Sequence, residues 1–136
     1  MSIRHIDHVA ITVADVDATL AFYRDVLDAR VLYEDLWRAG KIPVVLLQLG
    51  ASRLSVHDAK SPATPHADRP TPGSVDLCFR WDAPIEHAVA RLAQHGVAIL
   101  EGPVGRPAAD GALGQSVYFR DPDANLLELL STVETS

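Results

Sequence analysis

The chain has only one cysteine, Cys78, among its 136 residues. A single thiol excludes an internal disulfide and any zinc cluster built from several cysteines. Because Cys78 lies within an apolar, strand-like segment, we interpret it as a small buried hydrophobic residue rather than as a reactive thiol. Lysine and arginine form no run, and the net charge is −6, which argues against a nucleic-acid partner.

Long apolar runs are also missing. No stretch approaches the roughly 18 consecutive apolar residues of a membrane helix, and residues 1–5 lack the apolar segment of a signal peptide. We therefore expect a cytoplasmic protein with no membrane partner. Aromatic residues make up only 6% of the chain, which is little for a stacking groove, whereas hydrophobic residues make up 48%, enough for a core.

What the sequence does contain is one pattern written twice. When the chain is displaced by 68 residues, His8 falls on Asp76, residues 8–13 align with 76–81, and residues 28–32 align with 96–100 without a gap. A repeat of this kind determines the architecture before local propensities do. It also pairs polar residues of the two halves, as expected for a site built on a pseudo-two-fold axis.

Each half is predicted to run strand, helix and then three strands. The first half contains a strand at 6–13, a helix at 16–28 capped by Asp15, an extended segment at 29–34, a polar turn or loop at 35–41, and a hairpin of 43–49 with 53–57. The second half contains a strand at 74–81, a helix from Pro84 to about residue 95, a strand at 97–100, a long loop at 102–114, and a hairpin of 115–120 with 125–130.

Residues 61–73 are the clearest linker, because four prolines lie there among polar residues. The sequence predicts a single domain over 1–136, with one repeat at about 4–60, the linker at 61–73, and a second repeat at about 74–132. The expected fold class is α+β, with two βαβββ repeats whose mixed sheets curl into a cup flanked by helices.

Three segments resemble the vicinal-oxygen-chelate superfamily, which includes glyoxalase I, fosfomycin-resistance proteins, extradiol dioxygenases and bleomycin-resistance proteins. These segments are Asp7–Val13 with Phe22–Leu27, then Arg69–Phe79, and finally Ser116–Glu128. The last two are most similar to a bacterial subgroup of virulence proteins and glyoxalase-domain-containing proteins.

Two positions depart from the family pattern. Asp28 stands where a glycine usually ends the first helix, and Ala124 replaces the glycine of the last turn. If position 124 requires a positive φ, alanine costs about 1 kcal/mol there. We therefore expect a slightly adjusted turn and an intact fold.

The resemblance implies a divalent metal site. In the superfamily, ligands come from the start of each repeat's first strand and from each repeat's last strand, which gives His8, Asp76 and Glu128 here. Allowing one inserted residue, His57 is the first-half counterpart of Glu128. We predict His8, His57 and Glu128 as ligands, with Asp76 as a fourth ligand or as a residue that orients a ligand. Such a set suits Mn²⁺, Fe²⁺, Ni²⁺, Co²⁺ or Zn²⁺.

Each assignment has a structural alternative. His8 and Asp76 could serve only in hydrogen bonds or ion pairs, His57 could be an exposed histidine, and Glu128 could form a salt bridge. The predicted catalytic carboxylates are Glu128 and Asp76, either of which could move a proton beside a metal. The candidate substrate contacts are Trp37, Arg38, Arg53, Arg80 and Tyr118, with core packing or surface ion pairs as the alternative for each.

The function implied is a metal-dependent, glyoxalase-like lyase or isomerase that acts on a small substrate with adjacent oxygens. One alternative is an extradiol-type dioxygenase, which would use Fe²⁺ or Mn²⁺. Another is a metal-free protein that sequesters a drug or metabolite. The presence of His8 and Glu128 favours the metal-dependent function over sequestration. The resemblance also implies a homodimer.

Overall fold

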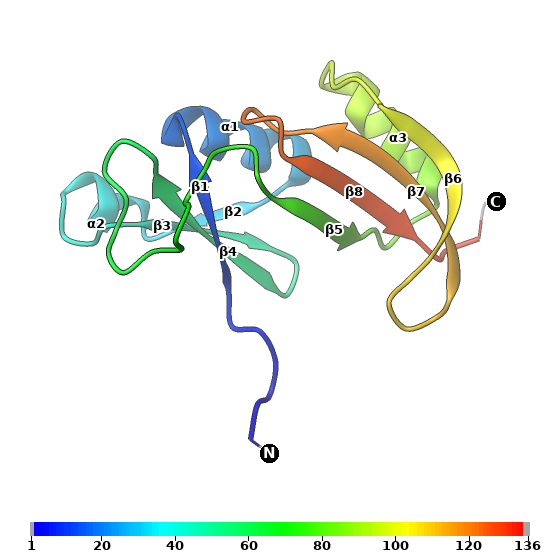
Figure 1. The fold of residues 1–136 in the computed structure, drawn as a ribbon. Coiled ribbons are helices and arrows are strands. Elements are labelled where there is room, and N and C mark those ends of the chain that lie inside the picture. Colours follow the sequence, from blue (N-terminus) through cyan, green and yellow to red (C-terminus); the bar gives the residue numbers. More distant parts are fainter. Residues whose placement is uncertain (1, 135–136) are drawn as a thin grey trace. The chain divides into compact units, whose positions relative to one another are not determined.

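The computed structural model describes residues 2–134 and divides into two compact units, Met1–Gly73 and Ser74–Ser136 (Figure 1). Each unit has its own four-stranded mixed sheet with few helices. The predicted α+β class and the strand–helix–strands order of each repeat are therefore confirmed. Within residues 2–134, no helix has both the length and the apolarity needed to cross a bilayer.

Unit 1 consists of β1 (Val9–Val13), α1 (Val16–Leu27), β2 (Arg30–Leu32), α2 (Glu34–Arg38), β3 (Val45–Leu49) and β4 (Ser52–Asp58). The strand order is β1-β4-β3-β2, with β1 parallel to β4 and the other pairs antiparallel. The start of α1 is as predicted, because Asp15 accepts a hydrogen bond from the backbone N of Ala18 at 3.1 Å.

The short helix α2 replaces part of the loop predicted at 35–41. Arg38 lies one turn after Glu34 and donates to its carboxylate at 2.7 Å, and it also donates to Asp17 of α1 at 2.6 Å. These two carboxylates raise the pKa of Arg38 above its usual value. The ion pairs tie α2 to α1 and supply the helix with contacts that a local propensity argument does not include.

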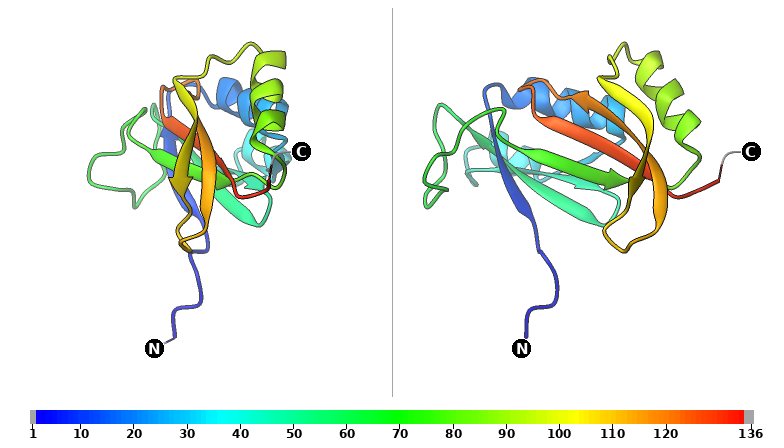
Figure 2. Two further views of the ribbon diagram at one scale, coloured as in Figure 1. Left: turned by 90° about the vertical axis from the view of Figure 1, so that its right-hand side faces the viewer. Right: turned by 45° about the vertical axis from the view of Figure 1, so that its right-hand side comes forward.

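Unit 2 consists of β5 (Asp76–Arg80), α3 (Ile85–Gln94), β6 (Glu101–Pro107), β7 (Leu113–Arg120) and β8 (Leu126–Ser131). The strand order is β5-β8-β7-β6. The helix α3 packs against β7 and β8, and both views in Figure 2 show it along one face of this sheet. Its buried residues Ile85, Ala88 and Leu92 face a core that includes Phe119 and Leu127.

The strand β6 corrects the sequence prediction, which placed a strand at 97–100 and a loop from 102 onward. Glycine and proline at 102–107 argue against a strand, yet β6 is the edge strand of its sheet, where a missing backbone donor is tolerated. Its pairing with β7 shifts register between Glu101 and Val104, an irregularity typical of a sheet edge.

The two family departures adopt the backbone that glycine would favour. Asp28 at the end of α1 has φ 57°, and Ala124 in the β7–β8 turn has φ 64°. The turn at Ala124 keeps its hydrogen bond, from the backbone N of Ala124 to the carbonyl O of Asp121 at 3.0 Å. Both residues therefore occupy the left-handed region at a local cost that the rest of the fold offsets.

Candidate functional site

One face of the unit 2 sheet carries the polar side chains. In the strand register, Cys78 of β5 lies beside Glu128 of β8, and Tyr118 of β7 lies opposite Glu128. Neighbours at the same ladder position share a face, and a strand alternates faces at each residue. We call this surface the unit 2 polar face; its residues are Asp76, Cys78, Arg80, Ser116, Tyr118 and Glu128. The opposite side is the buried core against α3.

The Glu128 carboxylate is held in place by a buried hydroxyl. Ser116 is fully buried and its Oγ donates a hydrogen bond to Oε2 of Glu128 at 2.5 Å. The Tyr118 hydroxyl and the Cys78 thiol also interact with this carboxylate. A carboxylate on an apolar strand is therefore supplied with donors instead of being buried alone, as the energetics of burial require.

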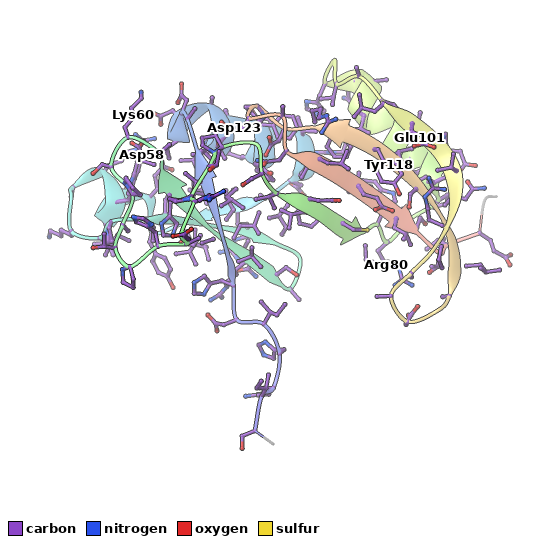
Figure 3. All side chains as sticks on the ribbon, viewed as in Figure 1. Asp58, Lys60, Arg80, Glu101, Tyr118 and Asp123 are labelled. Atoms are coloured by element: carbon purple, nitrogen blue, oxygen red, sulfur yellow. The ribbon has the colours of Figure 1, made fainter. Side chains whose placement is uncertain are left out.

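Tyr118 is in turn positioned from β6. The Arg106 Nε donates to the Tyr118 hydroxyl at 3.0 Å, and the guanidinium lies over the tyrosine ring at 5.6 Å from its centroid. Arg106 also pairs with Glu101 at 3.4 Å, and Figure 3 shows Glu101 and Tyr118 on these adjacent strands. Burial raises the pKa of Tyr118, and the Arg106 hydrogen bond opposes that rise. At neutral pH Tyr118 is thus a proton donor.

Cys78 differs from its predicted role as a buried hydrophobic residue, because the residue is exposed on the unit 2 polar face. Alternation along β5 explains this: Leu77 and Phe79 take the core side, which leaves Cys78 on the side of Glu128. Partial burial of the sulfur raises the pKa of Cys78 to about 11, and the charge and hydrogen bond of Glu128 act in the same direction.

This raised pKa predicts slow alkylation of Cys78. A rise from 9.0 to about 11 lowers the thiolate fraction at pH 8 about 100-fold. Iodoacetamide should therefore react about 100-fold more slowly with the folded protein than with the urea-unfolded chain at pH 8, as followed by mass spectrometry. The folded-state rate should rise about tenfold per pH unit toward pH 11.

The chain has no other cysteine, so every adduct reports on this position. Because the folded-state pKa is raised, the associated stability is complete below pH 9 and is lost as the pH rises toward 11. Equal alkylation rates for the folded and unfolded protein at pH 8 would contradict the assignment.

The unit 1 sheet has a corresponding polar side. Thr12 of β1 lies beside His57 of β4, and Ala10 lies beside Ser55. We call this surface, which comprises Ala10, Thr12, Arg53, Ser55 and His57, the unit 1 polar face. The Ser55 Oγ and the His57 Nε2 form a hydrogen bond of 3.2 Å. Burial lowers the pKa of His57, and positive charge on His8 and His66 acts in the same direction.

His8 lies one residue before β1 and is fixed by its neighbour. Its Nδ1 is 2.9 Å from Oδ2 of Asp7, and this contact holds the pKa of Asp7 below its usual value. A carboxylate accepts hydrogen bonds, so Nδ1 carries the proton and Nε2 of the neutral ring is left with a free lone pair. This is the arrangement found in histidines that bind metals through Nε2.

The strand registers define which positions of the two units correspond. Val9 lies beside Leu54 in unit 1, and Leu77 lies beside Leu127 in unit 2, so Leu54 corresponds to Leu127. The counterpart of Glu128 is therefore Ser55, at an offset of 73 residues (128 − 55), and not His57 as the sequence alignment had it. The reason is a difference of two further residues between the units, which keeps the same face and is invisible to an alternation pattern.

The predicted metal residues are divided between the units: His8 and His57 belong to unit 1, Asp76 and Glu128 to unit 2. Within either unit, the described residues contain no group of three or more His, Cys, Asp and Glu side chains that could hold a metal ion. The predicted substrate contacts are equally divided, with Trp37, Arg38 and Arg53 in unit 1 and Arg80 and Tyr118 in unit 2.

The arginines among these contacts differ in their engagement. The Arg80 guanidinium donates to Thr132 Oγ1 at 2.9 Å and lies 3.7 Å from Asp110. Arg38 is committed to Asp17 and Glu34 and also lies over the Trp37 ring at 5.1 Å. Arg53 is an exposed residue on the unit 1 polar face. Arg80 and Arg53 are therefore the cations placed on the polar faces, and Arg38 serves the α1–α2 contact.

Sequence reasoning missed two residues that support the site, Ser116 and Arg106. The register of the last hairpin would have found Ser116, because a turn centred on 122–123 brings residues 116–118 across from 128–130. Arg106 was missed because its segment was assigned to a loop. Its contact with Tyr118 depends on β6 being a strand.

Comparisons with known proteins agree with this geometry. Residues 5–129 match the model of the Glyoxalase/Bleomycin resistance protein/Dioxygenase superfamily. The chain is 41% identical over 130 residues to the virulence protein STM3117 of Salmonella typhimurium, covering 95% of this chain and 85% of that protein. It is 37% identical over 131 residues to the glyoxalase domain-containing protein RDO1 of Mycosarcoma maydis, covering 96% and 70% of the two proteins.

Solved structures extend the comparison. The crystal structure of STM3117 superposes with a TM-score of 0.87 at 39% identity, covering 98% of this chain and 100% of that one. At lower identity the fold alone is shared. A lactoylglutathione lyase from Agrobacterium tumefaciens has a TM-score of 0.69 at 24% identity, with 96% of each chain covered. A FosX fosfomycin resistance protein from Listeria monocytogenes, solved with Mn(II), has a TM-score of 0.62 at 19% identity, with 94% and 90% covered. The chain belongs to the glyoxalase, bleomycin resistance and dioxygenase superfamily, whose pattern the two βαβββ units repeat.

Proposed function

We propose that the protein is a divalent-metal-dependent lyase or isomerase of the glyoxalase type, acting on a small substrate with adjacent oxygens. The observation that supports this most is that two predicted ligands already have the partner that a metal ligand needs. Asp7 fixes the proton of His8 on Nδ1, and Ser116 holds one oxygen of Glu128. Such supporting hydrogen bonds orient ligands for a metal.

The donor chemistry fits a divalent transition metal. We assign His8, Asp76 and Glu128 as the ligands, because they occupy the matched starts of β1 and β5 and the polar side of β8. One imidazole and two carboxylates suit Mn²⁺, Fe²⁺, Co²⁺, Ni²⁺ or Zn²⁺. His57 is left out of this set because the register aligns it with Leu130, a ladder position beyond Glu128. The FosX structure with Mn(II) shows a metal in one relative with this fold.

When bound, such an ion would act as a Lewis acid toward the two adjacent oxygens of the substrate. The chain's own groups would do the rest. Glu128 would take up and return a proton at Oε1, since Ser116 occupies Oε2. Arg80 would bind an anionic group of the substrate, and Tyr118, oriented by Arg106, would donate a hydrogen bond to it.

The proposal is tested by the metal content of untagged protein purified without chelator. Elemental mass spectrometry should find about one transition metal ion per chain, as expected for a single site. Glu128→Gln and His8→Gln should each lower the metal content at least tenfold, because each removes a ligand. Glu101→Gln should retain the metal, since Glu101 lies on the neighbouring edge strand and pairs with Arg106.

Iron as the bound metal would favour the dioxygenase alternative over the lyase. Protein that contains no metal and takes up none on reconstitution would overturn the proposal. The metal-free sequestering function would then be the better account. The homodimer and the cytoplasmic location implied by the sequence remain predictions, to be checked by light scattering and by fractionation of the source cells.

A further inference from the structure

Unit 1 contains a pocket that the proposed metal chemistry does not use. Its volume is about 350 Å³, at the lower end of the roughly 300–1,000 Å³ of small-molecule sites. The wall on the sheet side belongs to the unit 1 polar face, and the other wall is the proline-rich segment 61–73, which Figure 1 shows passing in front of this sheet. The lining residues are Ala10, Thr12, His57, Pro65, His66, Ala67 and Pro70.

The segment predicted as a linker therefore forms one wall of a binding cavity. His66 on this segment is fixed by a hydrogen bond between its Nδ1 and the carbonyl O of Ala67 at 2.7 Å. A carbonyl oxygen only accepts, so Nδ1 carries the proton and Nε2 of the neutral ring is an acceptor. On the opposite wall, His57 is joined to Ser55 and Thr12 supplies a hydroxyl.

The remaining wall is apolar and uncharged. Pro65 and Pro70 contribute saturated rings, and Ala10 and Ala67 contribute methyl groups. Among the described residues that line the pocket there is no Asp, Glu, Lys or Arg. A strongly charged ligand would lose its hydration there without gaining an ion pair. A flat, neutral molecule with one hydrogen-bond donor matches these walls.

We propose that unit 1 binds a small aromatic molecule with a phenolic hydroxyl, whose O–H donates to Nε2 of His66 while its ring lies against Pro65 and Pro70. The site uses none of the three assigned metal ligands and no residue of unit 2. It is therefore independent of the proposed metal-dependent function and is tested in the presence of EDTA.

The test compares two probes that differ in one hydrogen atom donor. 2-Naphthol carries the hydroxyl, and 2-methoxynaphthalene keeps the ring system but cannot donate. Binding is followed at pH 8 by two-dimensional NMR of the imidazole side chains and by the fluorescence of the probes. We expect 2-naphthol to bind about tenfold more tightly, the value of one hydrogen bond, and to shift the resonances of His66 and His57.

Two variants address the two walls, and a third serves as control. His66→Ala should weaken 2-naphthol binding about tenfold and leave 2-methoxynaphthalene unchanged. Ala10→Leu should weaken both probes, because its side chain fills the pocket from β1. His87→Ala, on the exposed side of α3 in unit 2, should alter neither. Thermal unfolding of each variant confirms that it is folded.

The proposal is overturned if neither probe binds, if the two probes bind equally, or if both His66→Ala and Ala10→Leu leave 2-naphthol binding unchanged. None of these outcomes depends on the metal content of the protein, so the two proposals fail separately.

Discussion

Replacing Gly102 with alanine should lower the free energy of unfolding by about 4 kcal/mol, among the largest effects expected of a single methyl group. A Cβ at this position would lie 2.2 Å from the backbone O of Ser116 and 3.1 Å from the Cα of Val117. Both atoms belong to the backbone of β7, which cannot turn aside as a flexible side chain would. The φ of +106° at Gly102 adds strain of its own for any other residue.

The measurement is urea unfolding followed by circular dichroism, with Gly105→Ala as the matched control. Gly105 lies on the same edge strand, and its Cβ would meet no heavy atom within 4 Å. We expect that variant to stay within about 1 kcal/mol of the parent protein. Similar losses for the two variants would show that β6 does not approach β7 at Gly102 as described. Because Ser116 holds Glu128, Gly102→Ala should also weaken metal binding in any fraction that folds.

The second large effect is expected at the turn between β7 and β8. Asp121→Ala should lower the free energy of unfolding by about 3–4 kcal/mol, because it strands several buried donors at once. Oδ1 of Asp121 accepts from the backbone N of Asp123 at 2.9 Å and of Asn125 at 3.0 Å, and Oδ2 accepts from Nδ2 of Asn125 at 2.8 Å. Asn125 in turn accepts from the backbone N of Val75 at 3.0 Å.

Asp110→Ala is the control for this prediction. Oδ1 of Asp110 also accepts from the backbone N two residues later, Ala112, at 2.9 Å, but its side chain is 63% exposed. Water replaces that carboxylate when it is removed, so we expect a loss of no more than about 1 kcal/mol. Chemical denaturation of both variants gives the comparison. An Asp121 variant as stable as the Asp110 variant would mean that the turn does not anchor the start of β5.

Much of the fold could be predicted because the sequence states it twice. The repeat at 68 residues places the first strand of each unit, and the Asp15 cap marks where α1 begins. The strand β6 could not be predicted, since Gly102, Pro103 and Pro107 have low strand propensity and only the edge position makes them acceptable. The helix α2 likewise depends on ion pairs with Asp17, which is distant in the sequence.

The candidate site was predictable by face but not by register. Alternation alone places Asp76, Cys78 and Arg80 on one side of β5, as the structure has them. The match between His57 and Glu128 failed because a shift of two residues preserves the face, so only the hydrogen-bonded ladder distinguishes Ser55 from His57. The support of Glu128 by Ser116 and of Tyr118 by Arg106 requires the actual partners across strands.

The correspondence of Ser55 with Glu128 has a consequence for how such a chain diversifies. A duplicated module begins with every functional position in two copies, and only one copy of each must be kept. Here the acidic position survives in one module and has become a hydroxyl in the other, where a neighbouring histidine has joined it in a hydrogen bond. The second copy is thereby released to acquire different chemistry on an unchanged scaffold, and symmetry of fold is kept while symmetry of function is given up.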